Sequence, residues 1–175
     1  RLRDRGLHLT VAIDKVAASG GYMMACVAQH IIAAPFAIVG SIGVVAVHVD
    51  ESAADAKAGM AYTFLYAGAH KVDGHPHAPL PATVAADIQA DIEHLHDQFV
   101  DLIAGFRRLT PDVVRATEAR VYRGEAAITT GLADQIGTPR EALAALSQQL
   151  AMSTGRALVR KAASLCAAQL PEITF

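Results

Sequence analysis

This chain of 175 residues has few cysteines and only a small net charge. Its only cysteines are Cys26 and Cys166, too few for a disulfide framework, and this favours a reducing compartment. The formal net charge of −2 gives no electrostatic basis for binding nucleic acid. Internal repeats, low-complexity tracts and a recognisable signal peptide are also lacking. We therefore expect a soluble, cytoplasmic globular protein.

The chain also lacks an uninterrupted membrane span. Residues 31–49 are apolar except for Ser41 and His48, and their number is sufficient for a transmembrane helix. Three helix-breaking residues interrupt this run, namely Pro35, Gly40 and Gly43. Isoleucine and valine are concentrated in the short pieces between them, which predicts two or three buried strands joined by turns.

An apolar content of 53% is enough for a core, and strand-like and helix-like segments alternate. Strands are expected at residues 9–16, 30–34, 38–41, 44–47, 61–66 and 120–123. Helices are expected at residues 20–28, 51–58, 81–108, 124–130 and 139–150. A further helix is expected to begin at residue 110. This order predicts an α/β layered fold with a largely parallel sheet. We expect one domain over residues 1–151 and an Ala-rich tail over residues 152–175, either helical over 156–169 or disordered near Pro171.

The most informative motif is residues 17–22, with the sequence AASGGY. A β-branched strand that ends in serine and two glycines predicts a tight turn into a helix. Ser19 would lie at the helix N-terminus, where backbone N–H groups and the helix dipole stabilise an alkoxide or oxyanion. Gly20 and Gly21 leave room for close approach of a substrate. The motif alone leaves two interpretations open, a nucleophilic serine and a serine that caps the helix.

Lys71 follows the strand expected at residues 61–66, in a loop of small residues. Burial of an ammonium group is costly and favours the neutral amine. A neutral amine can accept the proton of a serine hydroxyl, so a buried Lys71 is a candidate general base for Ser19. A solvated loop lysine is the alternative. The neighbouring His70 offers a Ser–His pair instead, which requires a carboxylate partner that the sequence does not identify.

Three motifs occur in order along the chain: residues 17–22, residues 40–44 (GSIGV) and residues 68–71 (GAHK). Together they resemble the signal peptide peptidase A family of serine peptidases. Residues 120–126 and 131–134 are also typical, so the resemblance covers roughly residues 9–137. The loop AGAHKVDG and the prolines after it are more similar to the tailed-phage head-maturation branch than to the membrane-anchored bacterial branch.

This resemblance implies a crotonase/Clp-protease-like fold with a long helix packed outside the sheet. It implies that Ser19 is the nucleophile, that Lys71 is the general base and that Ser41, otherwise a simple turn serine, orients the lysine. The backbone N–H of Gly20, beside Gly21, would supply one oxyanion donor. No cofactor or metal is expected. The implied partners are a peptide or protein substrate, phage scaffold or capsid proteins, and further copies in a ring. Because rings can supply the serine and lysine from neighbouring subunits, we expect Ser19 and Lys71 to lie apart within one chain.

Residues 1–18 depart from the family pattern. Members of the family have, before the serine, a strand ending in a Gly-rich turn that gives a second oxyanion donor. Residues 1–18 contain no such segment, so we expect a fragment that lacks its N-terminal part. Loss of one oxyanion donor costs on the order of 10²–10³ in rate, which leaves an inactive fragment as a possibility.

Three other functions remain open. One is an inactive assembly or scaffold protein that keeps the fold. Another is a bacterial peptidase that degrades signal-peptide remnants. The last is a crotonase-type acyl-thioester enzyme, which would need a placed Glu or Asp base that the sequence does not show.

Two histidine pairs are weak metal ligands. His94 and His96 are two apart on a helix and so face different directions, and His75 and His77 lack further ligands nearby. Met23, Met24 and Met60 are expected in the core or lining a pocket, and Cys26 is expected in the core.

Overall fold

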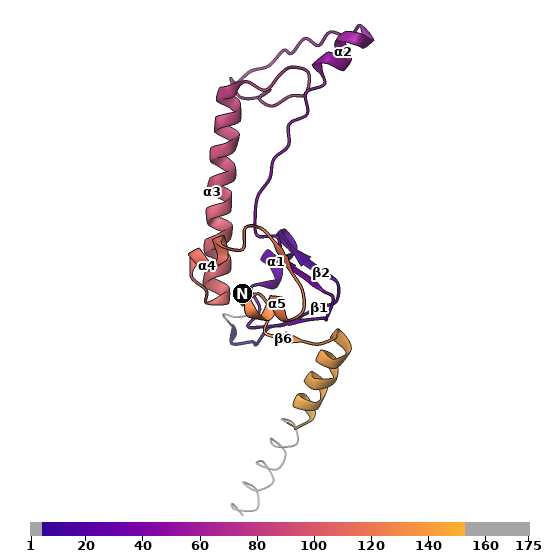
Figure 1. Cartoon of the computed structure of the whole chain (residues 1–175), viewed down its shortest axis with the longest axis vertical. Helices are drawn as coiled ribbons and strands as arrows, with labels where there is room; N and C mark the ends of the chain where they lie inside the picture. Colours follow the sequence, from indigo (N-terminus) through magenta and orange to yellow (C-terminus); the bar gives the residue numbers. More distant parts are fainter. Residues whose placement is uncertain (1–4, 153–175) are drawn as a thin grey trace, which may run out of the picture. The chain divides into compact units, whose positions relative to one another are not determined.

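The computed structural model describes residues 5–152, and the expected tail helix, Cys166 and Pro171 lie outside these residues. The elements in chain order are β1 (Thr10–Ile13), β2 (Val16–Ala18), α1 (Gly20–Ala25), β3 (His30–Ala33), β4 (Ile38–Gly40), α2 (Ser52–Ala58), α3 (Ala82–Arg107), α4 (Pro111–Arg115), β5 (Val121–Tyr122), α5 (Glu125–Thr129) and β6 (Gln135–Ile136) (Figure 1). A further helix covers residues 139–152. This is the mixed α/β architecture with a parallel sheet and a long helix that the sequence predicts.

The described chain forms two compact units. The first contains the described residues of Arg1–Ala17, Ala28–Val39 and Tyr122–Phe175. The second contains Ala18–Val27 and Gly40–Val121.

The first unit is built around a parallel three-stranded sheet in the order β1-β3-β6. Thr10 aligns with His30, and Ile32 aligns with Gln135. The side chain of Asp134 accepts a 2.7 Å hydrogen bond from the Ile31 N–H, and the Asp134 N–H donates a 2.9 Å bond to the Ile31 carbonyl. This double link holds the short strand β6, which the sequence analysis did not predict, beside β3.

The expected strand at residues 9–16 is two strands with different partners. β1 pairs with β3, whereas β2 belongs to a second sheet with the order β2-β4-β5. A bend at Asp14 and Lys15 separates them, and the Lys15 carbonyl accepts a 2.8 Å hydrogen bond from the Ile38 N–H. The sequence pattern could not reveal this change of sheet, because the partner of each strand comes from a distant part of the chain.

The second unit contains the long amphipathic helix α3. With 26 residues it is about 39 Å long. Its apolar face is buried only towards the C-terminal end, at Phe99, Val100, Ile103 and Ala104, where α1 and α4 pack against the helix. The Thr110 side chain caps α4 by accepting a hydrogen bond from the Val113 N–H, as the sequence predicts.

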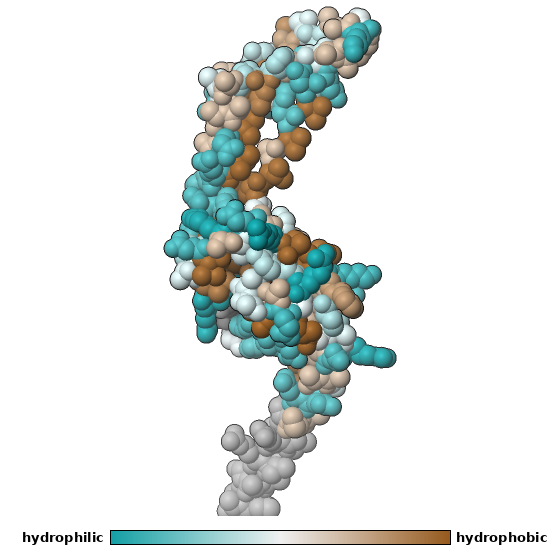
Figure 2. All heavy atoms as spheres, in the orientation of Figure 1, coloured by the Kyte–Doolittle hydropathy of each residue, from teal (hydrophilic) through white to brown (hydrophobic). Residues whose placement is uncertain are grey.

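The strands expected at residues 44–47 and 61–66 are not formed. Both segments are extended, but neither pairs with a strand in the described part of the chain. Their apolar side chains are therefore exposed, with Val45 82% and Val47 81% accessible. Figure 2 shows this unit's apolar atoms gathered along these segments and on α3. A periodic apolar pattern indicates a segment that can form a strand, but it cannot say where the partner strand comes from.

The apolar run at residues 31–49 is divided between β3, β4 and the extended segment after them. Among the described residues, no helix has both the length and the hydropathy to cross a membrane.

Sulfur-containing side chains divide into two groups. Cys26 ends α1 and is fully buried, and burial raises the pKa of its thiol to about 11, which confirms a packing role. Met23, Met24 and Met60 are 38%, 75% and 51% exposed, so a core position is wrong for them, and the alternative that they line a pocket stays a prediction.

Candidate active site

Ser19 lies at the junction of β2 and α1 with a strained backbone. Its φ of 52° and ψ of −124° are in a region that residues with a Cβ rarely adopt. The Ser19 carbonyl accepts hydrogen bonds from Tyr22 and Met23 of α1, at 2.9 and 3.0 Å, but its side chain makes no capping hydrogen bond. The serine therefore occupies the N-cap position without performing the side-chain role that favours serine there. Its hydroxyl is left exposed.

Gly20 and Gly21 leave open space beside this serine. A Cβ placed on either glycine would meet no atom within 4 Å. Within the described residues, the backbone N–H groups of both glycines donate no hydrogen bond. Two free donors next to an exposed hydroxyl are the arrangement that an oxyanion requires.

Ser41 is brought close to Ser19 through the backbone. The Ser19 N–H donates a 2.8 Å hydrogen bond to the carbonyl of Gly40, at the end of β4. Ser41 follows, half-buried and with a positive φ of 54°. Its N–H donates a 2.9 Å bond to the Arg120 carbonyl, so the motif at residues 120–126 supports the same turn. The motifs at residues 17–22 and 40–44 thus form one continuous structure.

Close packing behind Ser41 requires a glycine at position 43. A Cβ placed on Gly43 would lie only 2.7 Å from the Cβ of Ala119. Ala119 has a positive φ of 53° and belongs to the turn that leads to Arg120. Gly40, on the other side of Ser41, has a positive φ of 106°, so both glycines of this motif have a structural reason.

Lys71 lies in the loop between α2 and α3, and its side chain is exposed. Of the two alternatives that the sequence leaves open, the single chain has the exposed lysine. The Lys71 N–H donates a 3.1 Å hydrogen bond to the Gly68 carbonyl, so the backbone forms a turn here. Packing of Gly74 near Ile88 places this loop at the N-terminal part of α3.

Ser19 and Lys71 are held at opposite ends of α3. The segment that follows Ser19 packs against α3, and Arg107, the last residue of that helix, acts electrostatically on the Cys26 thiol. The Lys71 loop lies instead beside the start of the helix, which is about 39 Å long. The structure therefore brings Ser19 and Ser41 together but leaves Lys71 away from both. This separation is the one expected from the sequence.

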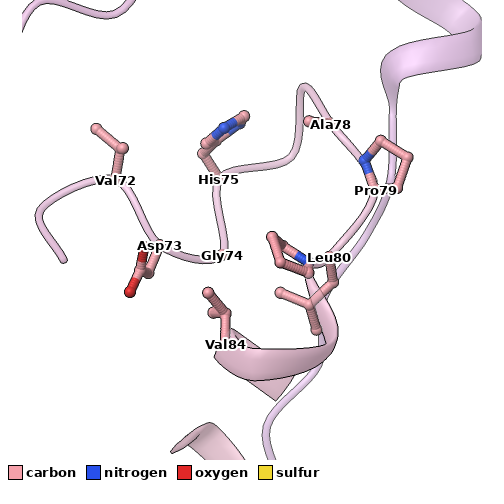
Figure 3. A pocket seen from close by; sticks show the side chains of 9 residues that line it. Val72, Asp73, Gly74, His75, Ala78, Pro79, Leu80 and Val84 are labelled. Carbon is pink, nitrogen blue, oxygen red and sulfur yellow. The ribbon is translucent and has the colours of Figure 1, made fainter. Parts of the chain in front are cut away.

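A small cavity of about 100 Å³ lies between the loop and the start of α3 (Figure 3). Most of its lining is apolar, with Asp73 and His75 as the titratable groups. The apolar lining consists of Val72, Gly74, Ala78, Pro79, Leu80, Pro81 and Val84.

Next to Lys71, the side chains of His70 and Asp73 form a pair that the sequence analysis did not find. The His70 Nδ1 lies 2.8 Å from a carboxylate oxygen of Asp73. Hydrogen bonding and attraction by this carboxylate raise the pKa of His70 above its usual value. A histidine followed three residues later by aspartate in a Gly-rich loop is the signal that could have revealed the pair.

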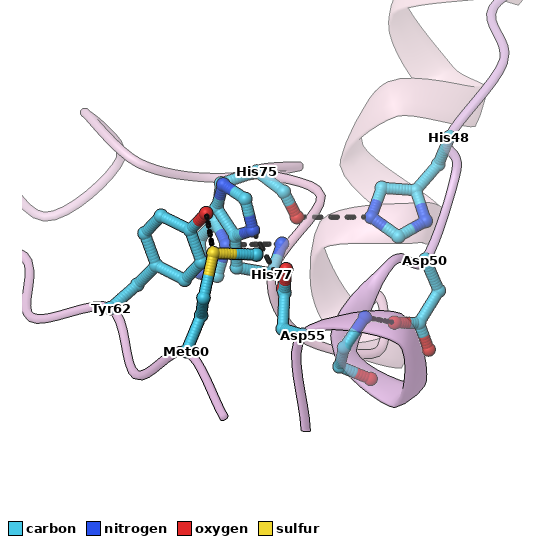
Figure 4. A network of polar contacts seen from close by, with 8 residues as sticks. His48, Asp50, Asp55, Met60, Tyr62, His75 and His77 are labelled. Carbon is cyan, nitrogen blue, oxygen red and sulfur yellow. Dashed lines mark hydrogen bonds and ion pairs between the residues drawn. The ribbon is translucent and has the colours of Figure 1, made fainter. Parts of the chain in front are cut away.

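A second histidine–carboxylate pair holds α2 against the same loop (Figure 4). The His77 Nδ1 lies 2.8 Å from the buried carboxylate of Asp55, and the ring stacks on Tyr62 with centroids 3.6 Å apart. The His48 Nε2 lies 3.1 Å from the His75 carbonyl oxygen. The described residues include no group of three or more His, Cys, Asp or Glu that could hold a metal ion. These histidines instead fix the shape of the segment that carries Lys71.

Comparison with known proteins identifies the family. Residues 1–153 match the profile of peptidase family S49. The chain belongs to this family. Membership confirms the resemblance drawn from the three sequence motifs, which occupy the Ser19 turn, the Ser41 turn and the Lys71 loop.

Phage proteins are among the S49 relatives of this chain. It is 35% identical over 132 residues to "Capsid assembly protease C" of Escherichia phage lambda, which covers 75% of this chain and 30% of the relative. It is 34% identical over 137 residues to "Head-tail preconnector protein GP5" of Enterobacteria phage P21, which covers 78% of this chain and 27% of the relative. "Probable protease SohB" of Haemophilus influenzae is 74% identical over 46 residues, covering 26% of this chain and 13% of the relative. The chain thus spans less than a third of the length of these relatives.

Proposed function

We propose that this chain carries the catalytic elements of a serine endopeptidase that uses a Ser19–Lys71 dyad. The observation that carries the proposal is the state of Ser19, whose backbone is strained and whose exposed side chain makes no capping hydrogen bond. Strain of about 1–3 kcal/mol persists at a residue when the surrounding structure imposes it, and such residues cluster at active sites. A strained serine between a strand and a helix also presents its hydroxyl as nucleophilic serines of other folds do.

In the proposed reaction, the neutral Lys71 amine takes the proton of the Ser19 hydroxyl. The alkoxide attacks a peptide carbonyl, and the free N–H groups of Gly20 and Gly21 stabilise the oxyanion. The C–N bond breaks, the leaving amine takes a proton, and an ester remains on Ser19. Water then hydrolyses the ester. Ser41, in the turn beside Ser19, is proposed to orient the lysine.

We propose that the dyad forms between two copies of the chain. Within one chain Ser19 and Lys71 lie at opposite ends of α3, and Lys71 is exposed. Water favours the protonated ammonium, which cannot act as a base, whereas a covering surface favours the neutral amine. The same unit exposes Val45, Val47 and Val49 on an extended segment without a partner. Such an unpaired apolar edge is a typical site for association with another chain.

The biological setting that we favour is the processing of phage head proteins, in a prohead. Its support is the pair of relatives named as a phage capsid assembly protease and a head-tail preconnector. A crotonase/Clp-protease-like assembly belongs to the same proposal, and the parallel sheet with a long helix is compatible with it.

The test is a peptidase assay on the protein as it is naturally expressed. An unfolded protein substrate is incubated with the wild type and with Ser19→Ala, Lys71→Ala and Lys57→Ala variants, and products are identified by mass spectrometry. Lys57 is an exposed lysine on α2 in the same unit, so Lys57→Ala controls for loss of a positive charge. We expect Lys57→Ala to cleave as the wild type does and the other two variants to be inactive while remaining folded. Undiminished cleavage by Lys71→Ala would refute the dyad.

A further inference from the structure

His70 has the environment of a histidine prepared for proton transfer. Its Nδ1 lies 2.8 Å from the Asp73 carboxylate, which fixes the proton of a neutral ring on Nδ1 and leaves the Nε2 lone pair pointing away from the carboxylate. Within the described part of the chain, Nε2 has no hydrogen-bond partner. The His70 side chain is 82% exposed, so a second group can reach it.

A catalytic triad consists of a serine, a histidine and a carboxylate, and His70 and Asp73 are of the last two kinds. The sequence alone does not identify a carboxylate partner for His70, and in the structure Asp73 is that partner. His70 also precedes Lys71 directly, in the turn closed by the Lys71–Gly68 hydrogen bond. One turn thus carries both side chains.

The geometry points to a further catalytic residue: His70, oriented by Asp73, transfers protons to the leaving amine and from the hydrolytic water at the Ser19–Lys71 site. This inference rests on the proposed function, because it takes the serine from the neighbouring copy.

Lys71 and His70 each take up one proton and release one proton in a full reaction cycle. In acylation, the Ser19 proton moves to Lys71, the Nε2 proton of the His70 imidazolium moves to the leaving nitrogen, and the C–N bond breaks as the ester forms. In deacylation, water gives a proton to the neutral His70 Nε2 and its oxygen attacks the ester carbonyl. The Ser19 oxygen leaves and takes the proton back from Lys71. Both residues end in their starting states, and one water is consumed for each peptide bond.

The charges around His70 favour its protonated form. The Asp73 carboxylate is the main cause of the raised His70 pKa, and Asp87 on α3 adds a weaker attraction in the same direction. Lys71 is the adjacent basic side chain in the loop. An imidazole whose pKa lies near the working pH can both donate and accept a proton efficiently.

The decisive variants distinguish the hydrogen bond between His70 and Asp73 from the ability of His70 to take up and release a proton. His70→Asn keeps an N–H donor at the position of Nδ1, so it can still bind Asp73, but it cannot carry a proton between groups. Asp73→Asn removes the negative charge and so lowers the pKa of His70. His94→Asn, at an exposed histidine on α3, is the matched control. Each variant of the naturally expressed protein is assayed for kcat/KM against pH on a peptide amide, and His70 is titrated by NMR.

We expect His70→Asn to lower kcat/KM by on the order of 10²-fold and His94→Asn to leave it unchanged. The protonated imidazole is the form that serves the leaving amine, so kcat/KM should fall as pH rises through the His70 pKa. In Asp73→Asn this fall should move to lower pH by the same amount as the NMR titration. Wild-type activity and an unchanged pH profile in His70→Asn would overturn the inference, as would a fall in kcat/KM that fails to follow the NMR titration of His70 in Asp73→Asn. Full activity of Lys71→Ala would instead overturn the dyad, so the two failures are distinguishable.

Discussion

The backbone N–H of Ser19 donates a 2.8 Å hydrogen bond to the carbonyl oxygen of Gly40, the residue directly before Ser41. This bond joins two turns that are far apart in the sequence, and both serines have a positive φ. The strain at Ser19 is therefore imposed by a neighbouring strand end rather than by local sequence preference.

Strain at Ser19 predicts an unusual order of stability among its variants. Ser19→Gly removes the Cβ that disfavours a φ of 52°, whereas Ser19→Ala keeps it. At an ordinary helix position glycine is less stable than alanine by about 0.5–1 kcal/mol. Here we expect Ser19→Gly to be more stable than Ser19→Ala by about 1 kcal/mol, measured by urea denaturation. A glycine variant less stable than the alanine variant would show that the backbone is relaxed in solution.

Gly43 and Ala119 should be energetically coupled. A Cβ on Gly43 would lie 2.7 Å from the Cβ of Ala119, and neither atom can move without its backbone. We expect Gly43→Ala to lower the free energy of unfolding by about 1–3 kcal/mol. Adding Ala119→Gly should recover most of that loss, because it removes the contact at a residue whose φ is already positive. Strictly additive effects in the double-mutant cycle would contradict this packing.

The Asp55–His77 pair should stabilise the segment that carries Lys71. His77→Ala leaves the buried Asp55 carboxylate without its 2.8 Å partner and removes the ring that stacks on Tyr62. We expect a loss of about 1–3 kcal/mol, seen as faster amide exchange at Glu51, whose N–H donates to the Pro76 carbonyl.

The control for this pair is the exposed His94→Ala, which should change stability by no more than about 0.5 kcal/mol. Equal exchange rates at Glu51 in the two variants would mean that the pair contributes nothing to the loop.

Much of the fold follows directly from the sequence. Helix α3 was predictable because its apolar residues recur at helical spacing and Pro81 lies at its start. The turn at Ser19 was predictable because a β-branched run ends in serine and two glycines. Gly59 ends α2 in the left-handed conformation, as expected for a glycine at a helix C-terminus.

Other features could not be predicted because they depend on distant partners. β6 has only two residues, and its position depends on the contacts of Asp134 with β3. The strands expected at residues 44–47 and 61–66 have the right pattern but no partner in the described chain. Exposure of Lys71 has the same origin, because burial of a loop depends on what packs against it. Asp55 and His77 are separated by 22 residues, and no local motif links them.

Mixing two inactive variants tests the central claim most directly. Ser19→Ala and Lys71→Ala proteins, in the naturally expressed form and with different affinity tags, are unfolded, mixed and refolded, and co-purification verifies that mixed assemblies form. A dyad shared between copies predicts that the mixture regains peptide cleavage, since some sites combine an intact Ser19 with an intact Lys71 of the neighbour. Verified mixed assemblies that remain as inactive as either variant alone would contradict the account.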